Sequence, residues 1–163
     1  MENIDLLDKY SKENFLSYLY LIKNEFWEVN DFINTLYNHK PFALDIRSSD
    51  SVQNALNIAV VISYSRNFKT NFGFNKAKKI NAELIKPYTA GENKLHKMIL
   101  DLRDTEFAHS DALPNDIQIY EENNKSYSRR VVRQLLEKIQ LEMLKEMVNK
   151  IREEIEVYIK YLI

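Results

Sequence analysis

The chain has 163 residues, a formal charge of −1 and no cysteine, and it contains only two glycines and three prolines. This length suits one domain with a sizeable core, and the shortage of glycine and proline disfavours an all-β fold. Because the charge is nearly balanced, no overall basic field attracts nucleic acid, and any RNA contact must be local. The absence of cysteine excludes disulfides, thiolate metal sites and cysteine nucleophiles.

Residues 1–10 are acidic and lack the basic and apolar regions of a signal peptide. Apolar runs such as residues 59–62 are far shorter than the roughly 18 residues that a membrane-spanning helix needs. We therefore expect a cytoplasmic protein without a membrane partner.

Residues 5–38 are predicted to form one long helix, which ends before Pro41 and a loop through Ser49. Apolar residues in this segment are spaced alternately four and three positions apart. That spacing draws a narrow apolar stripe, which is typical of a helix packed in a bundle. The stripe consists of Phe15, Leu19, Ile22, Phe26, Val29, Ile33 and Leu36.

A second helix is predicted from an N-cap at Ser49 or Asp50 to about Phe68. Arg66 lies near its C-terminal end, where the helix dipole favours a cation. Contact with an RNA phosphate is the alternative interpretation of this arginine. The expected inner face consists of Val52, Leu56, Ala59, Val60 and Ser63.

Residues 69–90 have a less regular pattern, and a short helix is expected near residues 75–85. Lysines gather around Gly73 and form either a solvated surface or an RNA backbone contact. These lysines are Lys69, Lys76, Lys78 and Lys79.

Residues 95–110 form the predicted central amphipathic helix, which begins soon after Gly91. Wound at about 100° per residue, this helix gathers its apolar residues on one arc, and four polar residues fall within the same arc. Burying such groups unpaired costs roughly 2–7 kcal/mol even when they are neutral, so they need partners or a function. The apolar members are Leu95, Met98, Ile99, Leu102 and Phe107, and the polar members are His96, Arg103, Glu106 and His109.

A small β-hairpin is expected over residues 117–128, where apolar and polar residues alternate around a polar turn. The last helix is expected from about Arg129 to Tyr161, with the same apolar spacing as the first. A basic patch at its start opposes the helix dipole, so the patch either binds RNA or is simply solvated. The patch consists of Lys125, Arg129, Arg130 and Arg133. The predicted fold class is all-α, a four-to-five-helix up-and-down bundle that forms one domain over residues 1–163.

Few catalytic arrangements are available, because the chain has only three histidines, His39, His96 and His109. Metal-ligand spacings, glycine-rich phosphate loops and the Gly-x-Ser-x-Gly motif are missing from the sequence, so no cofactor is expected. Arg103 and His109 remain, since a guanidinium stabilises charge on a phosphoryl oxygen and an imidazole transfers protons near neutral pH. Together they suffice for metal-free RNA cleavage, in which the 2′-hydroxyl attacks the adjacent phosphate.

A straight helix cannot aim both groups at one phosphate, because six residues separate Arg103 and His109 by about 240° and about 9 Å. Either the helix distorts before His109, or a second protomer completes the site in a two-fold dimer. Glu106 lies about one turn from both residues and could orient either one.

Segment 103–109, with the sequence RDTEFAH, resembles the signature of the HEPN superfamily. That signature is an arginine, usually followed by Asn, Asp or His, and then a histidine after four to six intervening residues. Arg103 matches the arginine, Asp104 the polar residue and His109 the histidine. The wider segment 102–111, and less specifically the helix ending at residues 63–67, resembles helical bacterial HEPN proteins related to toxin and phage-defence systems.

The resemblance implies a homodimeric, metal-independent ribonuclease with a composite site between protomers, which leaves a cyclic phosphate end on RNA. A cognate antitoxin would be a further partner. The implied catalytic residues are Arg103 and His109, with Asp104 and Glu106 positioning them. Weaker candidates for RNA backbone binding are Arg66, Arg129, Arg130 and Arg133. Toxins modified by a partner nucleotidyltransferase carry a tyrosine two residues after the histidine; this chain has Asp111 there, so AMPylation at that position is not expected.

Other interpretations stay open at this point. His109 could end the helix, where a cation is favoured, while Arg103 pairs with Glu106 or Asp104 for structural reasons alone. The chain could also be a non-catalytic HEPN-like module that binds RNA, a nucleotide or a protein. A purely structural helical dimer or an antitoxin-like partner is a further alternative.

Overall fold

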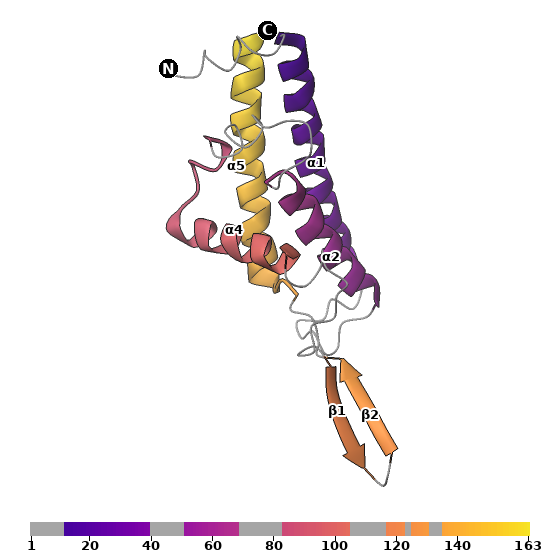
Figure 1. Cartoon of the computed structure of the whole chain (residues 1–163). Helices are drawn as coiled ribbons and strands as arrows, with labels where there is room; N and C mark the ends of the chain where they lie inside the picture. The colour runs from indigo at the N-terminus through magenta and orange to yellow at the C-terminus, as the bar shows by residue number, and fades with distance from the viewer. Residues whose placement is uncertain (1–11, 40–50, 69–82, 105–116, 123–124, 131–134) are drawn as a thin grey trace.

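The computed structural model describes residues 12–39, 51–68, 83–104, 117–122, 125–130 and 135–163. These residues form a helical bundle with a two-stranded antiparallel hairpin before the last helix, which confirms the predicted fold class (Figure 1). The elements in chain order are α1 (Lys12–Asn38), α2 (Ser51–Arg66), α4 (Ala90–Leu102), β1 (Ile117–Glu122), β2 (Lys125–Arg130) and α5 (Lys138–Leu162).

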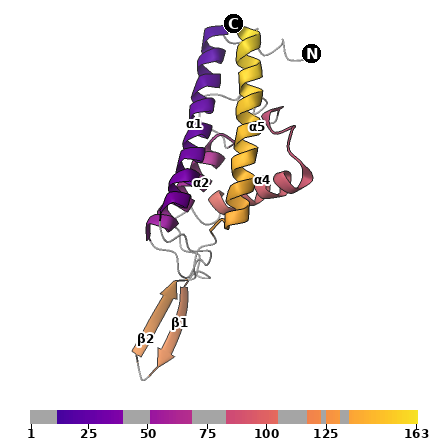
Figure 2. The same ribbon diagram turned by 180° about the vertical axis from the view of Figure 1, so that it is seen from behind.

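The two longest helices, α1 and α5, lie side by side and run in opposite directions (Figures 1 and 2). Polar groups mark their register: the Asn30 amide donates to Asn149 Oδ1 at 2.9 Å, and Lys23 forms an ion pair with Glu156. The predicted stripe of α1 is buried from Leu19 to Leu36. The alternating spacing therefore identified the core face of this helix correctly.

Helix α2 packs on α1 through aromatic rings, with Phe26 lying 5.9 Å from both Tyr64 and Phe68 between ring centroids. Its predicted inner face was partly wrong, because the Val52 side chain is 46% exposed. The buried face instead includes Asn57, whose amide makes two hydrogen bonds to the backbone of Leu136. A polar residue with such partners can be buried at little cost, and an apolar pattern does not reveal it.

Helix α4 crosses the bundle rather than running along α1 and α5 (Figures 1 and 2). It begins with a capping box, in which the Thr89 N–H donates to Glu92 Oε2 at 2.7 Å and the Glu92 N–H donates to Thr89 Oγ1 at 3.3 Å. This exchange satisfies two backbone donors that the first turn of a helix leaves without partners. Leu95, Ile99 and Leu102 are buried, as the predicted apolar arc requires.

The predicted hairpin is confirmed, and its strands pair from Ile117 with Arg130 to Glu122 with Lys125. The predicted start of the last helix at Arg129 was wrong, because residues 125–130 pair as β2. Helix α5 starts only after Glu137, whose N–H donates to Gln140 Oε1 at 2.8 Å. Arg129 and Arg130 therefore occupy a strand instead of a helix N-terminus.

Several predictions fall outside the described residues. These are the first helix before Lys12, the lysines around Gly73, most of the short helix near residues 75–85, and Arg133. Of that short helix, the structure describes residues 83–85, of which Glu83 and Leu84 are helical and Ile85 lies in a turn. Among the described helices, none is long and apolar enough to cross a membrane.

Candidate functional site

Arg103 follows the last residue of α4 and is the best-placed candidate of the described residues. Its backbone N–H is shared between the carbonyls of Ile99 and Leu100, so the residue continues the helical conformation. Its side chain is 34% exposed, and the guanidinium donates from Nη1 to Asp104 Oδ1 at 2.8 Å. A guanidinium carries five N–H donors and this bond uses one, so a solvent-accessible cation is held in place beside a carboxylate.

The helix changes geometry at this point, because Arg103 and Asp104 lie in a wider, π-helical turn. Single π turns inside helices are frequent at functional sites. Two arrangements were expected to bring Arg103 and His109 to one phosphate, and a distortion of the helix before His109 is one of them. Glu106 and His109 lie outside the described residues, so the pairing of Arg103 with His109 stays a prediction.

His96, the second polar residue of the predicted arc, is buried in an aromatic cluster. Its Nδ1 lies 2.9 Å from the Tyr64 hydroxyl, which lies 3.2 Å from the Tyr88 hydroxyl, and Tyr88 donates to the Met147 carbonyl at 3.4 Å. Each hydroxyl has one hydrogen, so all three bonds form only when His96 Nδ1 is the protonated nitrogen and donates to Tyr64. Burial raises the pKa of both tyrosines, so their hydroxyl groups stay neutral in this row of hydrogen bonds.

This chain of hydrogen bonds joins α2, α4 and α5 and has a structural rather than a catalytic character. The edge of the Phe68 ring packs on His96 with 4.6 Å between centroids, so the imidazole sits among aromatic rings. Satisfied polar groups of this kind favour one packing arrangement over others. The sequence correctly placed His96 on the inner face, and its partners explain why burial is tolerated.

Arg66 ends α2 and forms an ion pair with Glu25 of α1 at 3.8 Å. Burial raises the pKa of Glu25, and this effect outweighs the opposing effects of Arg66 and Asn67. Arg66 keeps 49% of its side chain exposed, which leaves it accessible to an anion. Arg66 and Arg103 thus pair with carboxylates on different segments of the chain.

The ends of α2 and α4 nevertheless meet in the core. Ser65, the neighbour of Arg66, donates its hydroxyl to the Ile99 carbonyl at 3.5 Å. That carbonyl also accepts the backbone N–H of Arg103. The Ile99 carbonyl oxygen therefore links the segments that carry the two arginines. The arginine side chains themselves form different ion pairs.

The remaining arginines of the predicted basic patch divide into two groups. Arg129 and Arg130 are adjacent in β2, where they pair with Gln118 and Ile117 of β1. Arg133 lies outside the described residues. Lys125, Arg129 and Arg130 therefore do not lie at the start of the last helix, where the sequence analysis placed the patch.

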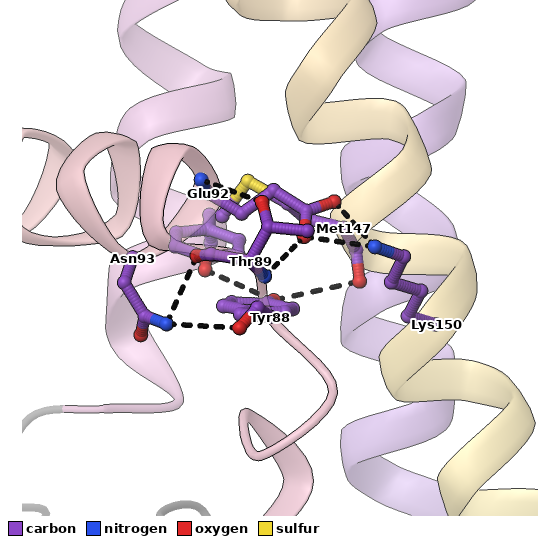
Figure 3. Close-up of polar contacts among 7 residues, drawn as sticks. Tyr88, Thr89, Glu92, Asn93, Met147 and Lys150 are labelled. Carbon is purple, nitrogen blue, oxygen red and sulfur yellow. Dashed lines mark hydrogen bonds and ion pairs between the residues drawn. The ribbon is translucent and has the colours of Figure 1, made fainter.

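Sequence reasoning missed the ion pair between Glu92 of α4, which is buried, and Lys150 of α5. Lys150 Nζ donates to both oxygens of the Glu92 carboxylate, at 2.7 and 2.8 Å (Figure 3). Burial alone would raise the pKa of Glu92, but hydrogen bonds from Lys150 and Thr89 outweigh it and hold that pKa below its ordinary value. The Thr89-x-x-Glu92 spacing is a capping-box signal that could have predicted half of this arrangement.

Within the part of the chain that the structure describes, no three His, Asp or Glu side chains gather so that they could hold a metal ion. Compared with known proteins, the chain matches no family model, no curated protein and no solved structure. The case for a function therefore depends on the residues themselves.

Proposed function

We propose that the protein is a metal-independent endoribonuclease of HEPN type, acting in toxin–antitoxin or phage-defence biology. The observation that carries the proposal is the accessible Arg103 guanidinium at the end of α4, fixed by Asp104 in the first two positions of the HEPN-like segment. The helical bundle provides the setting that the resemblance implies. A composite site would form where two copies of this segment meet in a homodimer.

The proposed reaction needs only groups that this chain carries. The ribose 2′-oxygen attacks the adjacent phosphorus as its proton passes to a base, and the bond from phosphorus to the 5′-oxygen breaks. His109 transfers one of the two protons, from the 2′-hydroxyl or to the leaving 5′-oxygen, and water accepts or supplies the other. Arg103 stabilises the negative charge that grows on the phosphoryl oxygens. The products are a 2′,3′-cyclic phosphate and a 5′-hydroxyl end.

Asp104 and Glu106 act in this proposal as positioning residues. The 2.8 Å bond from Arg103 to Asp104 restricts the guanidinium to a small set of rotamers. A preorganised cation loses less conformational entropy when the phosphate arrives than a mobile one does. Arg66 is a candidate for binding the RNA backbone, because half of its side chain is exposed.

The first test is incubation of the purified protein with mixed single-stranded RNA in EDTA. We expect cleavage by the wild type, and a loss of about 100-fold or more in Arg103→Ala and in His109→Ala. Lys97→Ala serves as the control, because Lys97 is an exposed cation on the opposite face of α4. Equal cleavage by wild type and both variants, or cleavage that EDTA abolishes, would contradict the proposal.

A mixing experiment tests the composite site. An Arg103→Ala protomer and a His109→Ala protomer are each inactive in their own homodimers. If Arg103 of one chain acts with His109 of the other, a mixed dimer keeps one intact site. Co-refolding the two variants in equal amounts should then restore about a quarter of wild-type activity, since half the dimers are mixed. No recovery in a mixture that contains mixed dimers would place both residues in one protomer.

The second candidate function is a non-catalytic HEPN-like module that binds RNA, a nucleotide or a protein as a helical dimer. The partly exposed Arg103 side chain supports it as well, because an arginine can bind an anion without a histidine that transfers protons. Binding of RNA with no turnover, lost in Arg103→Ala, would support this candidate over the ribonuclease.

A further inference from the structure

The end of α2 makes polar contacts with two other helices. On one side, Ser65 donates its hydroxyl to the Ile99 carbonyl of α4 at 3.5 Å. On the other side, Arg66 forms an ion pair with Glu25 of α1, and the Asn67 side chain hydrogen-bonds to the same carboxylate. One carboxylate of α1 therefore contacts two consecutive residues at the end of α2, beside the point where α2 meets the helix that leads to the candidate site.

The contact between Arg66 and Glu25 is loose. Arg66 Nη1 lies 3.8 Å from Glu25 Oε1, whereas hydrogen bonds between nitrogen and oxygen span roughly 2.7–3.2 Å. The contact of Arg103 with Asp104, at 2.8 Å, is within that range. Glu25 therefore attracts the Arg66 guanidinium but does not fix its orientation, as a hydrogen-bonded carboxylate would.

The two partners differ in their contact with solvent. The Arg66 side chain is 49% exposed, whereas that of Glu25 is only 20% exposed. Burial raises the pKa of Glu25, and Glu28 on the same helix raises it further, while Arg66 and Asn67 lower it by less than burial raises it. The ionised carboxylate is therefore incompletely compensated, and it gains from a cation that solvent and solutes can also reach.

We propose that Glu25 competes with RNA phosphates for Arg66 and so limits how tightly the protein binds RNA. Carboxylate and phosphate oxygens are alternative acceptors for one guanidinium, so the approach of a phosphate weakens the existing ion pair. This inference rests on the proposed ribonuclease function for RNA as the ligand. It adds to that function a residue that regulates RNA binding without contacting the reacting phosphate.

Positioning is the other role that a carboxylate beside an arginine can have, and it is the role proposed above for Asp104. The distances favour different roles for the two carboxylates, because a hydrogen bond at 2.8 Å restricts rotamers and an attraction across 3.8 Å does not. The sign of the effect separates the roles. Removing a competitor tightens RNA binding, whereas removing a positioning group weakens it.

Protonation of Glu25 should act like its replacement by glutamine. Because the pKa of Glu25 is raised above 4.5, its neutral form appears at a higher pH than that of an exposed glutamate. The difference in RNA affinity between the chain with Glu25 and the Glu25→Gln variant should therefore shrink as the pH falls through that raised pKa.

The test is fluorescence anisotropy with a labelled single-stranded RNA of about 12 nucleotides. The full-length chain carries Arg103→Ala so that the RNA is not cleaved. At about pH 7 we expect Glu25→Gln to tighten binding about two- to fivefold, the range of a partly exposed ion pair. Asp31→Asn is the matched control, because it removes one exposed carboxylate from the same helix and should change the affinity by less than about 1.5-fold.

Arg66→Met shows whether the gain acts through the arginine, since methionine keeps much of the apolar stem and removes the charge. It should weaken RNA binding several-fold, and Glu25→Gln should then give no more gain than Asp31→Asn. Circular dichroism checks the fold of each variant. A pH series with and without Arg66→Met is a second test that leaves Glu25 in place, and the effect of Arg66→Met should grow as the pH falls.

Weaker binding by Glu25→Gln, equal effects of Glu25→Gln and Asp31→Asn, a gain that persists in Arg66→Met, or no binding of RNA would overturn the inference. Tighter binding by Glu25→Gln without any RNA cleavage by the wild type would remove the proposed function and leave this inference standing. Arg103-dependent cleavage with no gain in Glu25→Gln would do the reverse.

Discussion

Lys150 of α5 donates to both carboxylate oxygens of Glu92 in the first turn of α4, at 2.7 and 2.8 Å (Figure 3). Glu92 also accepts the Thr89 N–H and is 6% exposed, whereas Lys150 reaches solvent. One carboxylate thus caps α4 and attaches it to α5. Because the candidate residue Arg103 directly follows α4, this ion pair helps to set where that arginine lies.

Lys150→Met is expected to destabilise the fold by about 2–3 kcal/mol, because it leaves the buried Glu92 carboxylate without its cation. The measurement is urea unfolding followed by circular dichroism. Lys138→Met is the matched control in the same helix, since the exposed pair of Lys138 with Glu142 at 3.9 Å should contribute less than about 1 kcal/mol. Similar losses in the two variants would show that Glu92 does not depend on Lys150.

Acidification should weaken the fold through Glu92. Its pKa is held below the ordinary value of 4.5, so the ionised form stabilises the folded state. That contribution is fully present above about pH 4.5 and is lost as the pH falls through the lower folded-state pKa. Unfolding free energies of wild type and Glu92→Gln should therefore converge as the pH is lowered below 4.5.

Glu25 acts in the opposite sense and needs a separate control. Its pKa is raised by burial, so its contribution is present at low pH and is lost as the pH rises through the raised pKa. Repeating the pH series in a Glu25→Gln background isolates the Glu92 effect. A gap between wild type and Glu92→Gln that stays constant with pH would contradict the assignment.

Tyr64→Phe should cost about 1–3 kcal/mol, although it removes only one oxygen atom. That hydroxyl contacts both His96 and Tyr88 inside the core, so its loss breaks the chain of hydrogen bonds that ends at the Met147 carbonyl. Thermal unfolding provides the measurement. Tyr20→Phe is the control, because Tyr20 is 42% exposed and should change stability by less than about 0.5 kcal/mol.

Asn57→Leu is expected to destabilise the fold by about 2–4 kcal/mol despite its more apolar side chain. The Asn57 amide donates to the Leu136 carbonyl and accepts the Leu136 N–H, both at 2.9 Å, and the substitution leaves two buried backbone groups without these partners. Chemical unfolding checks the value, with Asn24→Leu at an exposed position of α1 as the control. A neutral or stabilising Asn57→Leu would mean that water replaces the amide.

Asp104→Asn tests the positioning role within the proposed function. We expect kcat for RNA cleavage to fall about tenfold with little change in KM, because the neutral amide holds the Arg103 guanidinium less firmly. Arg103→Lys should be more damaging, since an ammonium cannot reproduce the forked geometry of a guanidinium. Steady-state kinetics separate the two effects, and an unchanged kcat in Asp104→Asn would remove the positioning role.

Periodic patterns accounted for most of the fold. The stripe from Leu19 to Leu36 is buried as predicted, His96 lies on the inner face of α4, and the alternation after residue 116 forms a hairpin. These features are local, since the period of apolar residues reports which side of a helix or strand meets the core. Of the predicted site residues Arg103, Asp104, Glu106 and His109, the structure describes Arg103 and Asp104, which form the ion pair that the structural interpretation of Arg103 offered.

The errors arose where contacts between distant residues decide the structure. The start of α5 was predicted too early, because the pairing of residues 125–130 with β1 competes with helix formation at Arg129. Val52 was assigned to the core, yet the buried position belongs to Asn57, which binds a backbone segment 79 residues away. Neither the pairing of β2 with β1 nor the contact of Asn57 with Leu136 can be predicted from the pattern of a few neighbouring residues.

The amino-acid sequence by itself determined the helical class, the apolar faces of α1 and α4, and the hairpin, because each depends on spacing along a short segment. Only the tertiary structure decided that α4 crosses the bundle, that Glu92 meets Lys150, and that Arg129 and Arg130 belong to a strand paired with β1. The physical reason is that these arrangements depend on pairing between residues far apart in the chain, which local periodicity does not encode.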